Sequence, residues 1–179
     1  SLADGGARVD EEARPDFDFP YSGAVFSQLI ATAVSGGYSH QEIEEMAARA
    51  RESGEAIPDS ALRHRGWLSA NERRLQMRRK WRTFFESWDV VLMPVSPVAA
   101  LPHDHSEPMA ERMIAVDGEQ RSYRDQMKWM GLTGVSFLPA TVVPVGLTSE
   151  GLPVGIQIAG PYLEDRTTLQ LARLLSERI

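Results

Sequence analysis

A serine and a lysine can together carry out hydrolytic chemistry, and this sequence has two lysines, Lys80 and Lys128. A serine hydroxyl is a weak nucleophile until a base removes its proton, and a lysine acts as that base only when its surroundings lower its pKa. Lys80 lies in a run of arginines, which predicts a solvated helix face. Lys128 follows Arg124 by one turn, with no pair of serines nearby. We therefore predict that neither lysine acts as a base.

A second candidate for chemistry is a proline-rich loop that carries His103, Asp104 and His105. Two imidazoles and a carboxylate could bind zinc, but ligands at i and i+2 are only part of a tetrahedral set. The other histidines, His40 and His64, lie in the helical half of the chain. We expect a solvated loop here, with no metal. Nothing in the sequence indicates a cofactor.

The third candidate is an aromatic stripe on a long helix predicted over Ala70 to Trp88. Its members recur at helical spacing: Met77, Trp81, Phe84, Phe85 and Trp88. Arginines occupy the remaining positions: Arg73, Arg74, Arg78, Arg79 and Arg82. Such a surface could bind nucleic acid, since bases stack on aromatic rings and phosphates pair with arginine. A net charge of −6 opposes that use, so we expect the stripe to dock the helix onto a sheet.

The composition is that of a soluble globular domain. The chain has 179 residues, of which 42% are hydrophobic and 25% charged, and this length can bury a core. Its acidic balance argues against nucleic acids and anionic membrane surfaces as partners, and no apolar run is long enough to span a bilayer. The absence of cysteine excludes disulfides and thiolate chemistry. A reducing, cytoplasmic location is the expectation.

The elements that would position these residues begin with a helical half. Residues 1–20 are acidic and contain two prolines, so we expect a flexible lead-in. A helix is predicted over Tyr21 to Ser35, ended by two glycines. Ser39 and Glu42 have the spacing of a capping box, which opens a second helix.

Two further helices are expected before the first strand. Pro58 begins a short helix, and Ser69 with Glu72 repeats the capping-box spacing ahead of the long helix. A short buried strand follows at Asp89 to Met93.

The second half mixes strands and helices. Met113 to Val116 and Gln120 to Tyr123 flank an Asp-Gly pair, which predicts a tight hairpin. Ser122 to Met130 is expected to be helical, with Gly131 and Gly134 breaking the chain after it.

Two apolar, β-branched runs, Ala140 to Val145 and Pro153 to Ala159, predict strands that are covered on both faces. A Gly-Pro pair stops the second strand, and Asp165 is placed to cap a final helix. The apolar face of this helix consists of Leu169, Ala172 and Leu175. The predicted fold class is α/β, with helices packed on a mixed β-sheet.

The end of the chain resembles the C-terminal signature of the amidase signature family of serine amide hydrolases. The resemblance lies in the order LPA, VVPVG, GLPVGIQIAGP and then an acidic residue that opens a last helix. Upstream, SWDVVLMPVSP is similar to the family's buried strand and its proline-rich turn, so the resemblance extends over about Asn71 to Ile179. Many members carry an asparagine and a glycine where this chain has Gly134 and Phe137.

Members of this family use a serine, a second serine on a cis peptide and a lysine, with both serines in a Gly/Ser-rich loop. Neither lysine of this chain is followed by such a loop. The resemblance therefore implies the C-terminal portion of an amidase domain over residues 21–179, helical in 21–88 and mixed in 89–179, with no catalytic residue of its own. Its main partner would be the missing N-terminal catalytic half. We also expect self-association, or the N-terminal helices folding over the sheet face left bare.

The resemblance implies that the intact enzyme hydrolyses a linear, non-peptide amide to a carboxylic acid and ammonia or an amine, and that this chain supplies scaffold and substrate pocket. The residues implied for substrate binding surround the proline-rich turn and the helix before the signature strands: Val95, Ser96, Met127, Met130, Gly131 and Phe137. Packing in the core is the alternative role for all six. The other functions left open are a non-catalytic binding module and part of an amidotransferase subunit.

Overall fold

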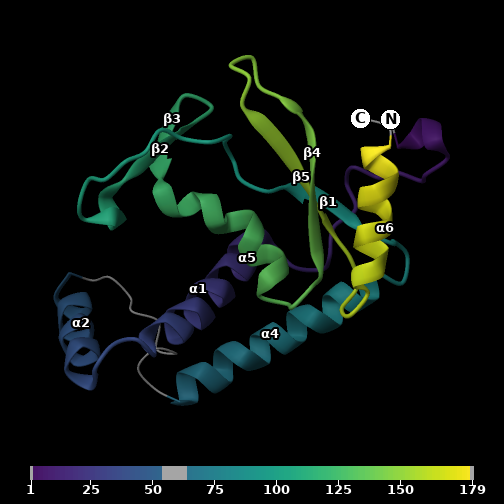
Figure 1. The fold of residues 1–179 in the computed structure, drawn as a ribbon. Coiled ribbons are helices and arrows are strands. Elements are labelled where there is room, and N and C mark those ends of the chain that lie inside the picture. The colour runs from purple at the N-terminus through teal and green to yellow at the C-terminus, as the bar shows by residue number, and fades with distance from the viewer. Residues whose placement is uncertain (1, 54–63, 178–179) are drawn as a thin grey trace.

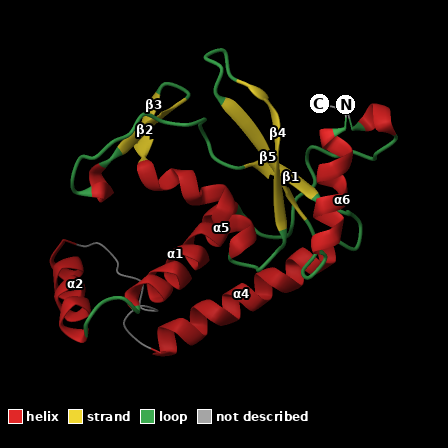
Figure 2. Ribbon diagram, viewed as in Figure 1, coloured by secondary structure: helices red, strands yellow, loops and turns green. Residues whose placement is uncertain are grey.

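Three strands form the central sheet of the computed structural model, which describes residues 2–53 and 64–177 (Figures 1 and 2). The strands are β1 (Val91–Pro94), β4 (Ala140–Leu147) and β5 (Pro153–Ala159), in the order β1-β5-β4. Both pairings are antiparallel. A short turn joins β4 to β5, and strands joined in this way form an antiparallel hairpin. The prediction of a mixed sheet is therefore wrong for the described strands.

The register of β4 against β5 changes near Pro144. Ala140 lies opposite Ala159 and Val142 opposite Gln157, and the pairing shifts between Pro144 and Gly146. Proline has no N–H to donate to the ladder, so an irregularity at this position is expected. Most of β4 is exposed, whereas β5 is buried toward its C-terminal end. The prediction that both strands are covered on both faces is therefore wrong for β4.

Helices cover the two faces of the sheet where it is buried (Figure 1). Helix α6 (Asp165–Ser176) packs on one face, where Val143, Ile158 and Ala172 form a buried cluster. The opposite face contacts α4 (His64–Phe84) and α5 (Lys128–Gly134). The result is a small sheet between helical layers.

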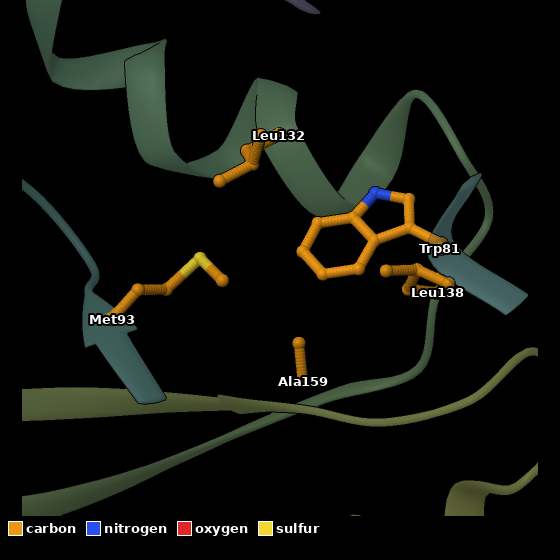
Figure 3. Close-up of a cluster of buried hydrophobic side chains, with 5 residues drawn as sticks. All are labelled: Trp81, Met93, Leu132, Leu138 and Ala159. Carbon is orange, nitrogen blue, oxygen red and sulfur yellow. The ribbon is translucent and has the colours of Figure 1, made fainter. Parts of the chain in front are cut away.

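Trp81 of the predicted aromatic stripe docks α4 onto the sheet, whereas Met77 packs against α1. The helix ends at Phe84, so its predicted end at Trp88 is wrong. Figure 3 shows the indole ring of Trp81 close to Leu138, above Ala159 of β5 and facing Met93 of β1. Leu132 of α5 completes this buried cluster. Trp81 is 1% exposed. Burying one large aromatic side chain contributes about 1.5–3 kcal/mol, so the ring is a main attachment of helix to sheet.

Helix α1 (Phe19–Ser35) packs against α4 and α5 through Val25, Met77 and Val135. Asp18 caps α1, because its side chain accepts a hydrogen bond from the Tyr21 N–H at 2.7 Å. The helix thus begins two residues before its predicted start.

One predicted capping box is confirmed and the other is wrong. Helix α2 (His40–Ser53) follows Ser39, whose N–H donates to the Glu42 carboxylate at 2.7 Å, while the Glu42 N–H donates to the Ser39 hydroxyl at 3.3 Å. Ser69 instead lies inside α4, which begins at His64. Capping-box spacing also occurs within helices, so the pattern alone does not locate a helix start. The short helix expected from Pro58 lies outside the described residues.

The predicted hairpin is present as β2 (Met113–Val116) and β3 (Glu119–Ser122). Asp117 and Gly118 both have positive φ, as a two-residue hairpin turn requires. A 3-10 helix, η3 (Tyr123–Met127), leads directly into α5. Gly131 lies inside α5, so the predicted break at this residue is wrong.

The start of α6 differs slightly from the prediction. Glu164 is the N-cap residue, without a side-chain capping bond, and Asp165 is the first helical residue. Ala172 is buried and Leu175 packs at the core, as predicted, but Leu169 is exposed and Thr168 occupies the buried position beside it. The Thr168 hydroxyl bonds to that of Thr141 on β4 at 2.9 Å.

The N-terminal lead-in contacts the far end of α4 and the turn that follows it. The Arg8 guanidinium donates to the Ser87 carbonyl at 2.7 Å and lies 4.1 Å from the centre of the Trp88 ring. Phe17 packs edge-on against Trp81, with ring centres 5.6 Å apart. The expected flexibility of residues 1–20 stays a prediction.

Candidate functional site

A buried amide side chain lies in the middle of β5, on the face that meets α5. Gln157 is only 7% exposed, and its Oε1 lies 3.4 Å from the hydroxyl oxygen of Thr133, which is buried as well. The Thr133 hydroxyl oxygen also lies within hydrogen-bond distance of the Met130 carbonyl oxygen, at 3.3 Å. The Gln157 Nε2 atom has no hydrogen-bond partner within the described part of the chain. An amide nitrogen carries two donors, so this position can donate to a further group.

An apolar surface adjoins this amide. Gly155 lies two residues before Gln157 on β5, and alternate residues of a strand share a face. A Cβ atom on Gly155 would lie 2.9 Å from a methyl carbon of Val142 and 3.8 Å from one of Val95. The two valine side chains therefore converge over the glycine. Val142 is 52% exposed, so this surface is open to a ligand or to another segment of protein.

Gln157 and Thr133 were not among the residues expected for the site. The available signal was the polarity of Gln157, because an amide stands alone in the apolar run of β5. A buried polar side chain requires hydrogen-bond partners, so an isolated one in a strand indicates a specific contact. Nothing in the sequence alone pairs it with Thr133.

Two of the six residues expected to bind substrate lie beside this surface. Val95 lies beside Gly155, and Met130 is linked to Gln157 through its carbonyl and Thr133. The Ser96 hydroxyl accepts a hydrogen bond from the Val98 N–H at 3.4 Å, within the turn after β1. Met127, at the end of η3, is partly exposed.

The remaining two expected residues contact other helices. Gly131 packs against the Phe26 ring of α1, where a Cβ atom would approach to 2.9 Å. Phe137 lies against α4, with its ring centre 4.4 Å from the Arg74 guanidinium carbon. Its backbone has φ +58°. These contacts give both residues a packing role, while their part in substrate binding stays a prediction.

Both lysines are bound to carboxylates. Lys80 Nζ lies 3.2 Å from Asp16, and Lys128 Nζ lies 2.7 Å from Asp125. Within residues 2–53 and 64–177, neither ammonium group forms a hydrogen bond with a serine hydroxyl.

The His103 to His105 loop does not form a closed ligand set. The two imidazole centres are 5.9 Å apart. Asp104 accepts hydrogen bonds from the hydroxyl and the N–H of Ser106, at 2.7 and 2.9 Å, and these bonds lower the pKa of its carboxyl group. Across residues 2–53 and 64–177, no three His, Cys, Asp or Glu side chains are grouped so that they could hold a metal ion.

The geometry around Gln157 can position a ligand but has no nucleophile and base of its own. It offers an amide donor beside exposed valines, which suits a substrate or a protein segment with one polar group next to an apolar part. Among the helices described, none combines the length and apolar character needed to cross a membrane.

The comparisons with known proteins are consistent with one another. A family model described as Amidase matches residues 26–169. A glutamyl-tRNA(Gln) amidotransferase subunit of Rhodospirillum rubrum is 33% identical over 112 residues, which cover 63% of this chain and 20% of that protein. An indoleacetamide hydrolase of Bradyrhizobium diazoefficiens is 36% identical over 104 residues, or 56% of this chain and 18% of the hydrolase.

Solved structures show the same fold. A crystal structure of an amidase matches with a TM-score of 0.65 and 21% identity, covering 90% of this chain and 37% of the other. A glutamyl-tRNA(Gln) amidotransferase subunit from Thermotoga maritima matches with a TM-score of 0.57 and 19% identity, covering 88% and 33%. The chain thus spans about a fifth of the length of these curated relatives and about a third of these solved chains.

Proposed function

Because this chain belongs to the amidase signature family, we propose that it forms the C-terminal scaffold and substrate pocket of an amidase. The intact enzyme would hydrolyse a linear, non-peptide amide to a carboxylic acid and ammonia or an amine. The observation that carries the proposal is the Gln157 amide, buried beside the exposed Val95 and Val142 with an unused donor.

The reactive groups would come from the part of the enzyme that this chain does not span. In the proposed reaction a serine oxygen attacks the amide carbonyl, the amine leaves with a proton, and water then hydrolyses the acyl-enzyme. Backbone donors in that part would stabilise the oxyanion. This division of labour is supported by the carboxylate partners of Lys80 and Lys128.

The acyl group of the substrate would rest on the apolar surface around Gly155. Val95 and Met130 are the best supported of the six expected residues, because Val95 contacts that surface and Met130 is linked to the buried amide. Their apolar character favours an alkyl or aryl acyl group. Gln157 would then hold either the substrate or the segment that carries the nucleophile.

A chimera tests the proposal. This chain would replace the aligned portion of the Bradyrhizobium indoleacetamide hydrolase, and ammonia release from indoleacetamide would be measured. We expect turnover by the chimera, and none by this chain alone, which should also remain unlabelled by a fluorophosphonate. Gln157→Leu in the chimera should lower kcat/KM about tenfold, the loss of one hydrogen bond in the reaction complex.

The matched control is Gln170→Leu, which changes an exposed glutamine of α6 and should leave kcat/KM unchanged. Hydrolysis by this chain alone would contradict the proposal. A chimera that is folded and monomeric by sedimentation but inactive would favour the non-catalytic binding module instead.

Part of an amidotransferase subunit is the second candidate. It is favoured by the identity to the Rhodospirillum protein and by the Thermotoga fold match. In that case the released ammonia would pass to an acyl group held by partner proteins. To distinguish the two candidates, the same exchange would be made in the Rhodospirillum protein and the chimera assayed for glutamine hydrolysis. Activity in this chimera but not in the indoleacetamide hydrolase chimera would favour the amidotransferase subunit.

A further inference from the structure

A groove of about 620 Å³ lies between α4 and the turn that joins β5 to α6. Its floor is apolar and includes Trp81, Phe85 and Leu138. One wall is α4 with three arginines, Arg78, Arg79 and Arg82, and the other is the turn with Pro161 and Tyr162. The proposed amidase function does not use this groove.

Two arginines on the α4 wall of the groove have no ion-pair partner among the described residues. Arg79 is paired with Glu72 at 3.1 Å, but no carboxylate in the described ranges pairs with Arg78 or Arg82. Two acidic residues, Glu86 and Glu164, also line the groove, and Glu164 accepts a hydrogen bond from the Thr167 hydroxyl at 3.2 Å. A further arginine, Arg74, lies one turn before Arg78 on α4. Burial lowers the pKa of Arg74, and the positive charge of Arg78 lowers it further.

Strained and exposed apolar residues flank the same groove. Leu163 has φ +68° and is 75% exposed, and Phe137 has φ +58° and is 49% exposed. A left-handed backbone costs a non-glycine residue about 1–2 kcal/mol, and such strain gathers at functional positions. Arg78 lies over both neighbouring rings, 3.8 Å from the centre of Tyr162 and 5.8 Å from that of Phe137. Exposed aromatic rings with arginine are the typical composition of a protein-binding surface.

We propose that this groove binds an extended acidic segment of a partner protein. Arg78 and Arg82 are one turn apart, which separates them by about 6 Å along the helix. Carboxylates two residues apart on an extended peptide are separated by nearly the same distance, about 6.6 Å. Their side chains would face the arginine wall, while the intervening apolar side chain would face Pro161 and Tyr162. A Glu-Leu-Glu pattern therefore matches both walls.

Charge and shape favour this occupant over nucleic acid. The chain carries a net charge of −6, and its positive charge here is confined to one wall of a groove rather than spread over a face. A phosphate backbone follows an extended basic surface, whereas an alternating peptide uses one charged and one apolar wall.

The test is binding of a fluorescein-labelled Glu-Leu-Glu-Leu-Glu-Leu peptide to the full chain, followed by fluorescence anisotropy. A Gln-Leu peptide of the same length is the uncharged comparison. We expect binding of the acidic peptide that weakens as salt is raised, and Arg78→Gln/Arg82→Gln should weaken it about tenfold or more. The matched control, Arg124→Gln/Arg173→Gln, makes the same change in net charge at exposed sites away from the groove and should shift Kd less than about twofold.

Circular dichroism checks that the variants fold. Should the double variant misfold, Arg82→Gln alone suffices, since no described ring or carboxylate contacts this exposed side chain. The proposal is overturned if the acidic peptide does not bind, if the Gln-Leu peptide binds equally well, or if the control variant loses as much affinity. It is also overturned if a single-stranded oligouridine binds the groove more tightly than the acidic peptide.

Discussion

At the scale of single residues, close approach rather than chemistry explains some of the positions that the sequence singled out. Gly131 was expected at the substrate pocket, and the structure packs it against Phe26. Gly134, at the end of the same helix, has nothing within 4 Å of an added Cβ atom. The two glycines look alike in the sequence and differ only in what lies opposite them.

We predict that Gly131→Ala destabilises the fold by about 1–3 kcal/mol, because the new methyl group overlaps the Phe26 ring. The alanine gains about 1 kcal/mol of helix propensity, which offsets part of this cost. Urea unfolding followed by tryptophan fluorescence measures the difference.

Gly134→Ala is the matched control, with the same propensity gain and no overlap. It should leave stability unchanged or raise it by up to about 1 kcal/mol. Equal effects of the two substitutions would mean that α1 and α5 are not in close contact.

At the scale of elements, local signals determine helix α2 more than packing does. The helix begins at the reciprocal hydrogen bonds between Ser39 and Glu42. Ala47 contributes a buried side chain to its packing. The Ser39 N–H, and then its hydroxyl, lower the pKa of Glu42. A carboxylate whose pKa is lowered on folding stabilises the helix above its ordinary pKa of about 4.3, and this contribution is lost as the pH falls through the folded value.

We therefore expect the first turn of α2 to fray on acidification below about pH 4.3, and Glu42→Gln to remove this pH dependence. Ser39→Ala should fray the same turn at neutral pH, because loss of an N-cap residue typically lowers helix stability by about 1 kcal/mol. Cα chemical shifts of residues 40–43 report both effects. The first turn of α1, capped by Asp18, serves as the internal reference and should not change with Ser39→Ala.

At the scale of the whole molecule, the outer half of the β4–β5 hairpin is uncovered. Helices α4, α5 and α6 pack on the buried part of the sheet, while Val142, Val145, Leu147 and Val154 remain exposed, Leu147 at 70%. β4 is also an edge of the sheet. An exposed apolar edge strand pairs readily with another chain. In the proposed enzyme, the catalytic half would cover it.

We predict that the chain alone self-associates through this hairpin as its concentration rises, with binding of a hydrophobic dye. Leu147→Lys should shift sedimentation toward the monomer, because charge on an edge strand opposes pairing. Val34→Lys, at the exposed end of α1, adds the same charge elsewhere and should not shift it. A compact monomer without dye binding would contradict this prediction.

Much of the fold follows from local sequence. Three features depend on residues a few positions apart, and each was predicted: strands β4 and β5, the β2–β3 turn at Asp117-Gly118 and the α2 capping box. The sheet class was predicted wrongly, because strand pairing depends on elements distant in the chain. The helix start at Ser69 and the break at Gly131 were also wrong, because the helices extend beyond these local signals. The part of the six expected residues in substrate binding stays a prediction.

Residue types and their spacing were enough to specify the strands of the central sheet, the β2–β3 turn and the family, because apolar period, turn chemistry and residue identity are local properties. Only the tertiary structure paired Gln157 with Thr133, set Val95 and Val142 over Gly155, and stacked Arg78 on Tyr162. Burial and hydrogen-bond satisfaction are decided by neighbours that lie far away along the chain, and these neighbours turn an apolar strand into a candidate binding surface.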